Sequence, residues 1–269
     1  MVPSNPNALS SDLRILVTND DGIHAPGLKI LEKIARRLSK DVWVVAPSQE
    51  QSGAGHSLSL SRPLRIQRHS QRRYSVDGTP TDCVLMAVRK ILPKKKPNLV
   101  LSGINYGGNL GEDVTYSGTV AAAMEGLLLG IPSIALSQMI TRPHPPKWST
   151  ALHFAPSIIQ QLLTTGWRKH ILININFPDA IVSSVKGIRV ASQGFRSVSG
   201  DKVTENHDPR GKPYYWIGPQ LCHDCFTPNT DLDAIARNYI ALTPLHIDLT
   251  HTESLPGLNK TFEAFKLPA

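Results

Sequence analysis

The sequence predicts an α/β fold, with a mostly parallel sheet that carries helices on both faces and a smaller β-rich region after it. Up to about residue 177, short apolar, β-branched runs alternate with segments of helical periodicity, which is the pattern of consecutive βαβ units. Helix-start signals such as Pro26 and the Thr79-Pro80 pair separate strands from helices. From Pro178 onward the runs become shorter and the loops longer.

The first unit has the clearest pattern. Residues Leu13–Asn19 form a predicted strand, and Pro26–Leu38 form a predicted helix whose apolar side chains recur on one face. A second buried strand is predicted at Asp41–Ala46. A strand, a helix and a second strand in this order imply two parallel strands joined by a right-handed crossover.

The later elements continue this alternation. We predict β structure within Leu58–Val76, a helix from Thr79, a strand at Asn98–Ser102, a helix from Ser117 to Leu129, a strand at Ile131–Leu136, a helix at Trp148–Leu163 and a strand at His170–Asn176. In the last third we predict short β runs at Gly187–Ala191, Tyr214–Ile217 and Tyr239–Leu242, a helix capped by Thr230, and a long polar loop over residues 200–212.

These patterns divide the chain into three parts. Residues 1–12 are rich in Pro, Ser and Asn and are expected to form a disordered tail. Residues 13–177 are expected to form the catalytic α/β domain. Residues 178–269 are expected to form a β-rich region that serves oligomerisation and is a candidate for exchange between subunits.

Charge and composition restrict the class of function. The chain has 29 Lys and Arg against 21 Asp and Glu, a formal charge of +8, which attracts anions such as phosphates and nucleotides. The run Lys94–Lys96 is short and indicates a solvated loop, so no stable nucleic-acid partner is expected. No signal peptide or membrane-spanning stretch is recognisable, so we expect a cytoplasmic protein. The Cys222-x-x-Cys225 pair lacks the second pair that a structural zinc site requires.

The first predicted strand ends in Asn19-Asp20-Asp21-Gly22. In open α/β sheets, ligands bind outside the carboxyl ends of the strands. Two adjacent carboxylates repel each other unless a cation lies between them, and oxygen ligands suit Mg²⁺, Ca²⁺ and Mn²⁺. The alternative is ordinary turn chemistry, since Asn, Asp and Gly dominate turns.

Two further loops leave the predicted sheet at the same edge. Residues 47–56 contain Ser52, whose hydroxyl could reach a cation or a phosphate, although an ordinary flexible loop is the simpler interpretation. Residues 103–111 are rich in Gly and Asn and precede a buried helix that begins near Ser117. Such a loop and helix N-terminus can bind phosphate, but helix capping is the alternative role for the serine. Neither the P-loop nor the dinucleotide-binding pattern is present.

Taken together, these loops resemble the SurE (survival protein E) family of metal-dependent nucleotidases. Any one motif is weak, but several in the right order are specific. The matching segments are Asn19–Ile23, Ala46-Pro47 to Gly53, Gly78–Val84, Ser102–Asn109, Tyr116–Val120, Pro209–Gly211, Thr230-Asp231 and Thr243–Leu245. The N-terminal tail and the segment after His251 depart from the family pattern, and neither contains a motif.

The resemblance implies a Rossmann-like domain and a C-terminal part that helps to form homodimers or homotetramers. It implies one divalent cation per subunit, Mg²⁺ or Mn²⁺, and hydrolysis of nucleoside 5′- and 3′-monophosphates, with short polyphosphate as a further substrate. The implied metal ligands are the residues at Asp20, Asp21, Ser52 and Asn105. Phosphate is expected to bind at Asn109, Ser117, Gly118 and Thr119.

We expect Asp20 and Asp21 to be the catalytic residues, because one of them, or a metal-bound water that they orient, can provide the nucleophile. His56 lies near Ser52 and is a candidate general acid, although a structural loop histidine is the simpler interpretation. A haloacid-dehalogenase-type phosphatase would need Asp-x-Asp after the first strand, which this chain lacks. A non-enzymatic nucleotide sensor is the alternative from another class of function.

Overall fold

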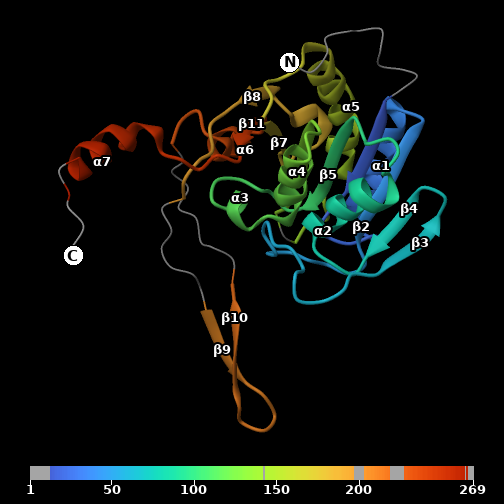
Figure 1. Cartoon of the computed structure of the whole chain (residues 1–269), viewed down its shortest axis with the longest axis horizontal. Coiled ribbons are helices and arrows are strands. Elements are labelled where there is room, and N and C mark those ends of the chain that lie inside the picture. The colour runs from blue at the N-terminus through green and yellow to red at the C-terminus, as the bar shows by residue number, and fades with distance from the viewer. Residues whose placement is uncertain (1–12, 142, 197–202, 219–226, 264, 266–269) are drawn as a thin grey trace.

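The computed structural model describes residues 13–141, 143–196, 203–218, 227–263 and residue 265 (Figure 1). The predicted tail at 1–12 and the Cys222/Cys225 pair lie outside these residues. None of the helices in the described part of the chain combines the length and apolarity that crossing a bilayer requires.

One nine-stranded sheet forms the centre of the molecule, in the order β3-β4-β2-β1-β5-β6-β7-β11-β8 (Figure 1). The strands from β4 to β7 in this order are parallel, while β3 and β11 are antiparallel to their neighbours β4 and β7. The strands are β1 (Arg14–Thr18), β2 (Asp41–Pro47), β3 (Ile66–Ser70), β4 (Arg73–Val76), β5 (Leu99–Tyr106), β6 (Ser133–Gln138), β7 (Ile171–Phe177), β8 (Ile188–Val190) and β11 (Ile240–His246). The predicted fold class is confirmed.

Helices cover both faces of this sheet. Successive side chains of a strand point to opposite faces, and here the side chains on both faces are apolar. Helices α1 (Pro26–Leu38) and α5 (Trp148–Thr165) pack on one face, around a core that contains Ile15 and Val17. Helices α2 (Pro80–Met86) and α4 (Gly118–Leu128) pack on the other face, around a core that contains Leu16 and Val100. The short helix α6 (Asp231–Ala236) packs against β11, β7 and β8 at one end of the sheet. The other short helices are α3 (Asp113–Tyr116) and α7 (Leu255–Phe262).

Several predicted boundaries hold, notably those of α1 and the capped start of α2. The Thr79 side chain accepts a hydrogen bond from the Asp82 amide, and the Asp82 side chain accepts one from the Thr79 amide, which forms a capping box. Cys83 is fully buried beside them, as a packing residue. In the segment 58–76, by contrast, only residues from Ile66 onward form strands, and Leu60 is 88% exposed.

The long polar loop predicted over residues 200–212 is wrong for the described residues from 203 onward. Val203–His207 form β9, which pairs with β10 (Pro213–Ile217) in an antiparallel hairpin that extends away from the main sheet (Figure 1). Strands β8 and β11, also from the last third of the chain, join the main sheet instead. The C-terminal part therefore completes the central sheet as well as supplying the hairpin.

The strand β5 bends sharply before its carboxyl end. Its register against β6 shifts between Ser102 and Asn105. Gly103 has φ +130°, and a Cβ there would lie 2.1 Å from the carbonyl oxygen of Leu136, so only glycine fits this backbone. The bend places Asn105 and Tyr106 at the same edge of the sheet as the end of β1.

Candidate active site

Asp20 and Asp21 lie directly after β1, at the carboxyl edge of the sheet. The Asp20 side chain is buried and accepts a hydrogen bond from the Thr119 hydroxyl at the start of α4. Asp21 is half-buried, and its Oδ2 accepts a hydrogen bond from the Tyr106 amide nitrogen at 3.2 Å. The two carboxylates are therefore held by two different elements, the end of β5 and the first turn of α4.

Burial shifts the proton equilibrium of both carboxyl groups. It raises the pKa of Asp20 above its usual range, against the opposing hydrogen bonds from Thr119. It also raises the pKa of Asp21, to about 7, and the charge of Asp20 adds to this shift. The carboxylate of Glu50 contributes to both shifts in the same direction. The negative charges of Asp20 and Glu50 therefore reinforce the effect of burial, and no cationic side chain is among the causes of either pKa shift.

This arrangement fits a hard divalent cation. The paired carboxylates, the Thr119 hydroxyl and the nearby Glu50 carboxylate present oxygen atoms, the donors that Mg²⁺ and Mn²⁺ prefer. Within the described ranges no cluster of three or more His, Cys, Asp or Glu side chains has metal-binding spacing. Any further ligands must therefore come from neutral oxygens.

Asn105 and Ser52 are the neutral candidates from the sequence. The Nδ2 of Asn105 donates to the carbonyl of Gly107 at 3.0 Å, which leaves the side-chain oxygen for a cation. The Ser52 hydroxyl donates to Oε1 of Glu50 at 2.9 Å. Its loop is fixed to the site by the Gln51 amide, which donates to the carbonyl of Asp20 at 2.8 Å.

The N-terminus of α4 lies against Asp20. A Cβ at Gly118 would come within 2.8 Å of the Asp20 Cβ. The Ser117 hydroxyl accepts a hydrogen bond from the Val120 amide at 3.0 Å, so this serine caps the helix. The first amides of a helix have no intrahelical partner. The Thr119 amide bonds to the Asp20 carboxylate, and this end of the helix favours negative charge.

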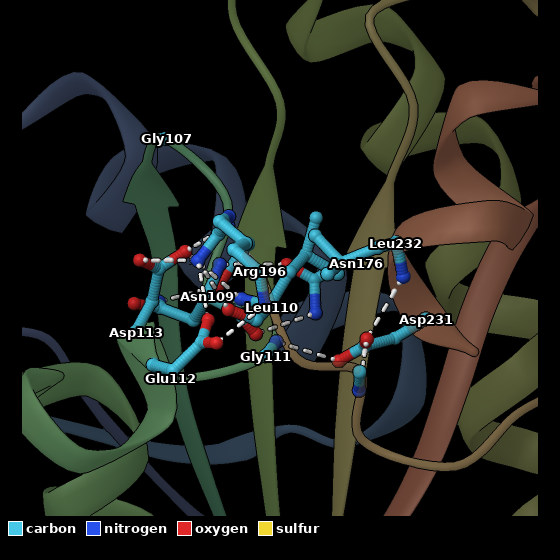
Figure 2. A network of polar contacts seen from close by, with 12 residues as sticks. Gly107, Asn109, Leu110, Gly111, Glu112, Asp113, Asn176, Arg196, Asp231 and Leu232 are labelled. Carbon is cyan, nitrogen blue, oxygen red and sulfur yellow. Dashed lines mark hydrogen bonds and ion pairs between the residues drawn. The ribbon is translucent and has the colours of Figure 1, made fainter. Parts of the chain in front are cut away.

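Asn109 is positioned differently from the other predicted phosphate-binding residues. It is buried, its backbone amide donates to Oδ1 of Asn176 at 2.8 Å, and its Nδ2 donates to the Ser137 hydroxyl at 2.8 Å. Its carbonyl accepts hydrogen bonds from Asn174 and Asn176 (Figure 2). The backbone N–H and one N–H of Nδ2 are thus engaged with the sheet, and phosphate binding by this residue stays a prediction.

His56 contacts α4 away from its N-terminus. Its Nε2 lies 3.3 Å from Oε2 of Glu125, a buried carboxyl group. Glu125 follows Gly118 by seven residues, which corresponds to about 10 Å along the helix axis. This contact fits an anchoring role for the loop histidine.

Sequence reasoning missed three groups at the site: the Glu50 carboxylate, the Tyr106 amide and the role of the Thr119 hydroxyl as a donor to Asp20. The position of Glu50, two residues before Ser52, was the one local signal available. The other two contacts join residues more than 80 positions apart in the chain, and no local pattern encodes them.

Comparisons with known proteins bear on this site. A family model described as Survival protein SurE matches residues 15–200. A protein of Paramagnetospirillum magneticum named 5′-nucleotidase SurE is 60% identical over 257 residues, which cover 96% of this chain and 98% of that protein. A protein of the same name from Parvibaculum lavamentivorans is 56% identical over 261 residues, which cover 96% of this chain and 94% of that protein. The crystal structure of a SurE protein from Aquifex aeolicus superposes with a TM-score of 0.80 at 40% identity, over 92% of this chain and 99% of that one.

Proposed function

Because the chain belongs to the SurE survival protein family, we propose that it is a metal-dependent 5′-nucleotidase, a phosphomonoesterase that converts nucleoside 5′-monophosphates to nucleoside and phosphate. Relatives at 60% and 56% identity carry the name 5′-nucleotidase. The observation that supports the metal and phosphate chemistry is the pair of adjacent carboxyl groups at Asp20 and Asp21, with raised pKa values. Asp20 is buried against the N-terminus of α4, and Asp21 is half-buried.

The two aspartates and Asn105 would hold the proposed cation, one Mg²⁺ or Mn²⁺ per subunit, and Ser52 would be a fourth ligand from the adjacent loop. A divalent cation at this position polarises a phosphoryl oxygen and offsets the charge that develops on the leaving oxygen. The aspartates bind it in their ionised form. Their raised pKa values in the protein alone indicate that this negative charge is poorly compensated without a cation.

The protein supplies the remaining functions. The amide of Gly118 binds a phosphoryl oxygen, and the helix dipole of α4 favours the anion. The amide and hydroxyl of Thr119 hold Asp20 in place. The Ser117 cap keeps the first turn of α4 in place. Asp20 or Asp21 attacks phosphorus or orients the water that does so. The bond from phosphorus to the ester oxygen breaks, and the leaving oxygen takes up a proton to become the nucleoside hydroxyl. The water consumed in the reaction supplies this proton overall. Where the carboxylate attacks first, that water hydrolyses the acyl phosphate, which releases phosphate and restores the aspartate.

This site recognises phosphate through a cation and backbone amides, and both kinds of contact are independent of the base. For this reason we extend the proposal to nucleoside 3′-monophosphates and to short polyphosphate. In each case a terminal phosphoryl group would occupy the same position beside α4, and the group that leaves would differ.

The decisive experiment measures phosphate release from a panel of nucleoside 5′- and 3′-monophosphates and from tripolyphosphate, with Mn²⁺ or Mg²⁺ and then with EDTA. We expect release that stops on chelation and returns when metal is added. Equal release with and without chelator would contradict the metal dependence. Nucleotide binding without release, under every metal condition, would contradict the enzyme proposal and favour the sensor.

We also propose that the β9–β10 hairpin joins two copies of this chain in a homodimer or homotetramer. Tyr214 and Trp216 lie on one face of the hairpin and Tyr215 and Ile217 on the other, and their exposed fractions range from 42% to 84%. An isolated two-stranded hairpin is marginally stable in water. Large exposed apolar side chains of this kind mark interaction surfaces.

Replacing Tyr215 and Trp216 together by serine is expected to weaken subunit association by roughly tenfold or more, because aromatic anchors dominate interfaces. Sedimentation velocity over a concentration series measures this change. Arg210→Ser, in the exposed turn of the same hairpin, is the matched control. Unchanged association in the double variant would contradict the proposal.

The cytoplasmic location of the protein stays a prediction.

A further inference from the structure

The geometry points to Asp231 and Arg196 as positioning residues that hold the connector between the two halves of the active site. The connector is residues 107–116, and the two side chains reach it from the C-terminal part of the chain (Figure 2). The inference deepens the proposed function and rests on it. Neither residue contacts Asp20 or Asp21, so their effect on the reaction would pass through the connector.

The connector joins the groups that hold the two carboxylates. At its start, the Tyr106 amide binds Asp21. At its end, α3 leads through Ser117 into the first turn of α4, where the Thr119 hydroxyl binds Asp20. A displacement of the connector therefore moves the partners of both carboxylates at once. Within the connector, Asn109 bonds to Asn176 of β7 and Ser137 of β6 and so attaches the connector to the sheet.

Asp231 fixes the connector from the side. Its carboxylate is fully buried and accepts hydrogen bonds from three amides, those of Gly111 at 3.0 Å, Gly194 at 2.8 Å and Leu232 at 2.8 Å. The first lies in the connector and the second in the segment after β8. A Cβ at Gly194 would lie 2.9 Å from Oδ1 of Asp231, so the absence of a side chain there allows this close approach.

Arg196 holds the connector immediately after Gly111. Its guanidinium donates to Oδ1 and Oδ2 of Asp113 at 3.0 and 2.7 Å, to Oε2 of Glu112 at 3.3 Å and to the carbonyl of Leu110 at 3.0 Å. Its backbone amide also donates to Glu112. The arginine side chain is only 10% exposed, and such bidentate, partly desolvated pairs are geometrically specific.

The two contacts fit a positioning role better than a role in folding. The segments that carry them are anchored independently. For Asp231, Thr230 caps α6 and β11 pairs with β7 over six positions; for Arg196, the preceding strand β8 pairs with β11. The apolar core around Ile15 lies on the α1 face of the sheet and contains neither residue. Loss of either contact should therefore free the connector while the sheet stays intact.

Asp231→Asn is the sharpest test, because it preserves the shape of the side chain. The remaining carbonyl oxygen can take the position of Oδ1 and keep the amides of Gly194 and Leu232. The new NH₂ group then faces the N–H of Gly111, and two donors cannot bond to each other. The substitution thus removes the contact to the connector and keeps the contacts within the C-terminal segment.

The experiment compares wild type with Asp231→Asn, Arg196→Met and Arg196→Lys, using the full chain. Arg237→Met is the control, since that guanidinium is 59% exposed and pairs only with Asp233 among the described residues. Three quantities are measured: amide hydrogen exchange in metal-free protein, Mn²⁺ affinity by calorimetry, and kcat and KM for the best nucleoside monophosphate. Thermal unfolding of each variant monitors the fold.

We expect faster exchange in residues 107–119 of Asp231→Asn and Arg196→Met, with unchanged exchange in β1 and β5. We also expect a loss of about 10- to 100-fold in Mn²⁺ affinity or kcat, the usual effect of removing a partner that orients a metal ligand. Arg196→Lys should be intermediate, because lysine cannot form the bidentate pair. The control should match wild type.

Unchanged connector exchange, or faster exchange with unchanged Mn²⁺ affinity and kcat, would overturn the positioning role. Faster exchange throughout the sheet in both Asp231→Asn and Arg196→Met would also overturn it, in favour of a role in global stability. If wild type itself releases no phosphate, the proposed function fails. The exchange and calorimetry data still report whether the connector is held and whether it affects the metal site.

Discussion

An Asp20→Asn variant is expected to lose about a thousandfold or more in metal-dependent turnover while remaining folded. Partners that only orient a metal ligand are worth about 10- to 100-fold, and Asp20 is proposed to bind the cation directly. The asparagine keeps the size of the side chain and can still accept the Thr119 hydrogen bond. The variant therefore removes a negative charge from the site with little change in packing.

The same substitution is expected to stabilise the metal-free protein at neutral and alkaline pH. The unfolded carboxyl group of Asp21 ionises near 3.8, and the folded one near 7. Between these values the folded state binds more protons, so the stability of the wild type falls as pH rises from about 4 to about 7. Asp20→Asn removes the negative charge that contributes to this shift, and it removes the raised pKa of Asp20 itself.

Thermal unfolding in EDTA between pH 4 and pH 8.5, with phosphate release in Mn²⁺, tests both parts of this prediction. At the alkaline end we expect a Tm a few degrees above wild type, since about 1 kcal/mol corresponds to roughly 2–4 °C in a chain of this size. Glu253→Gln, an exposed carboxyl group near α7, is the control. Turnover like that of wild type would exclude Asp20 as a metal ligand. Parallel stability curves would show that its burial has no cost.

Local patterns in the sequence were sufficient for much of the fold. The apolar periodicity of residues 26–38 identifies both ends of α1, because a helix buries one face at a fixed spacing. The Thr79-Pro80 signal identifies the start of α2. In the hairpin at residues 203–217, the predicted run Tyr214–Ile217 matches β10, but β9 could not be identified in the same way. All residues of β9 are exposed, so no burial pattern marks it, and the two strands depend on pairing with each other.

The candidate site divides along the same line. Asp20 and Asp21 were predicted because two adjacent carboxylates at the end of a strand repel each other unless a cation lies between them. The internal hydrogen bonds of Asn109 and the contact of Asp231 with Gly111 join segments 28 to 120 residues apart. Such contacts depend on the order of strands in the sheet, which sequence periodicity does not encode.

Gly118→Ala is the second substitution for which we expect a large effect on activity. The new Cβ would lie 2.8 Å from the Cβ and 3.0 Å from Oδ2 of Asp20, and 3.0 Å from Cγ of Pro80. Either Asp20 or the first turn of α4 must move to relieve this crowding. Displacements of about 1 Å at a catalytic site can cost about 100-fold in rate, and we expect a loss of that size in kcat/KM.

Gly126→Ala in the same helix separates crowding at the site from crowding in the core. Its Cβ would lie 2.4 Å from the Ser133 hydroxyl and 2.8 Å from Cγ2 of Val100, about 12 Å along the helix axis from Gly118. Overpacking of this kind costs about 1–3 kcal/mol, so we expect a lower Tm with nearly normal kcat/KM. For Gly118→Ala we expect the reverse, a large loss of kcat/KM with a small change in Tm. If both variants lost activity only in proportion to stability, close contact between α4 and Asp20 would not matter for the reaction.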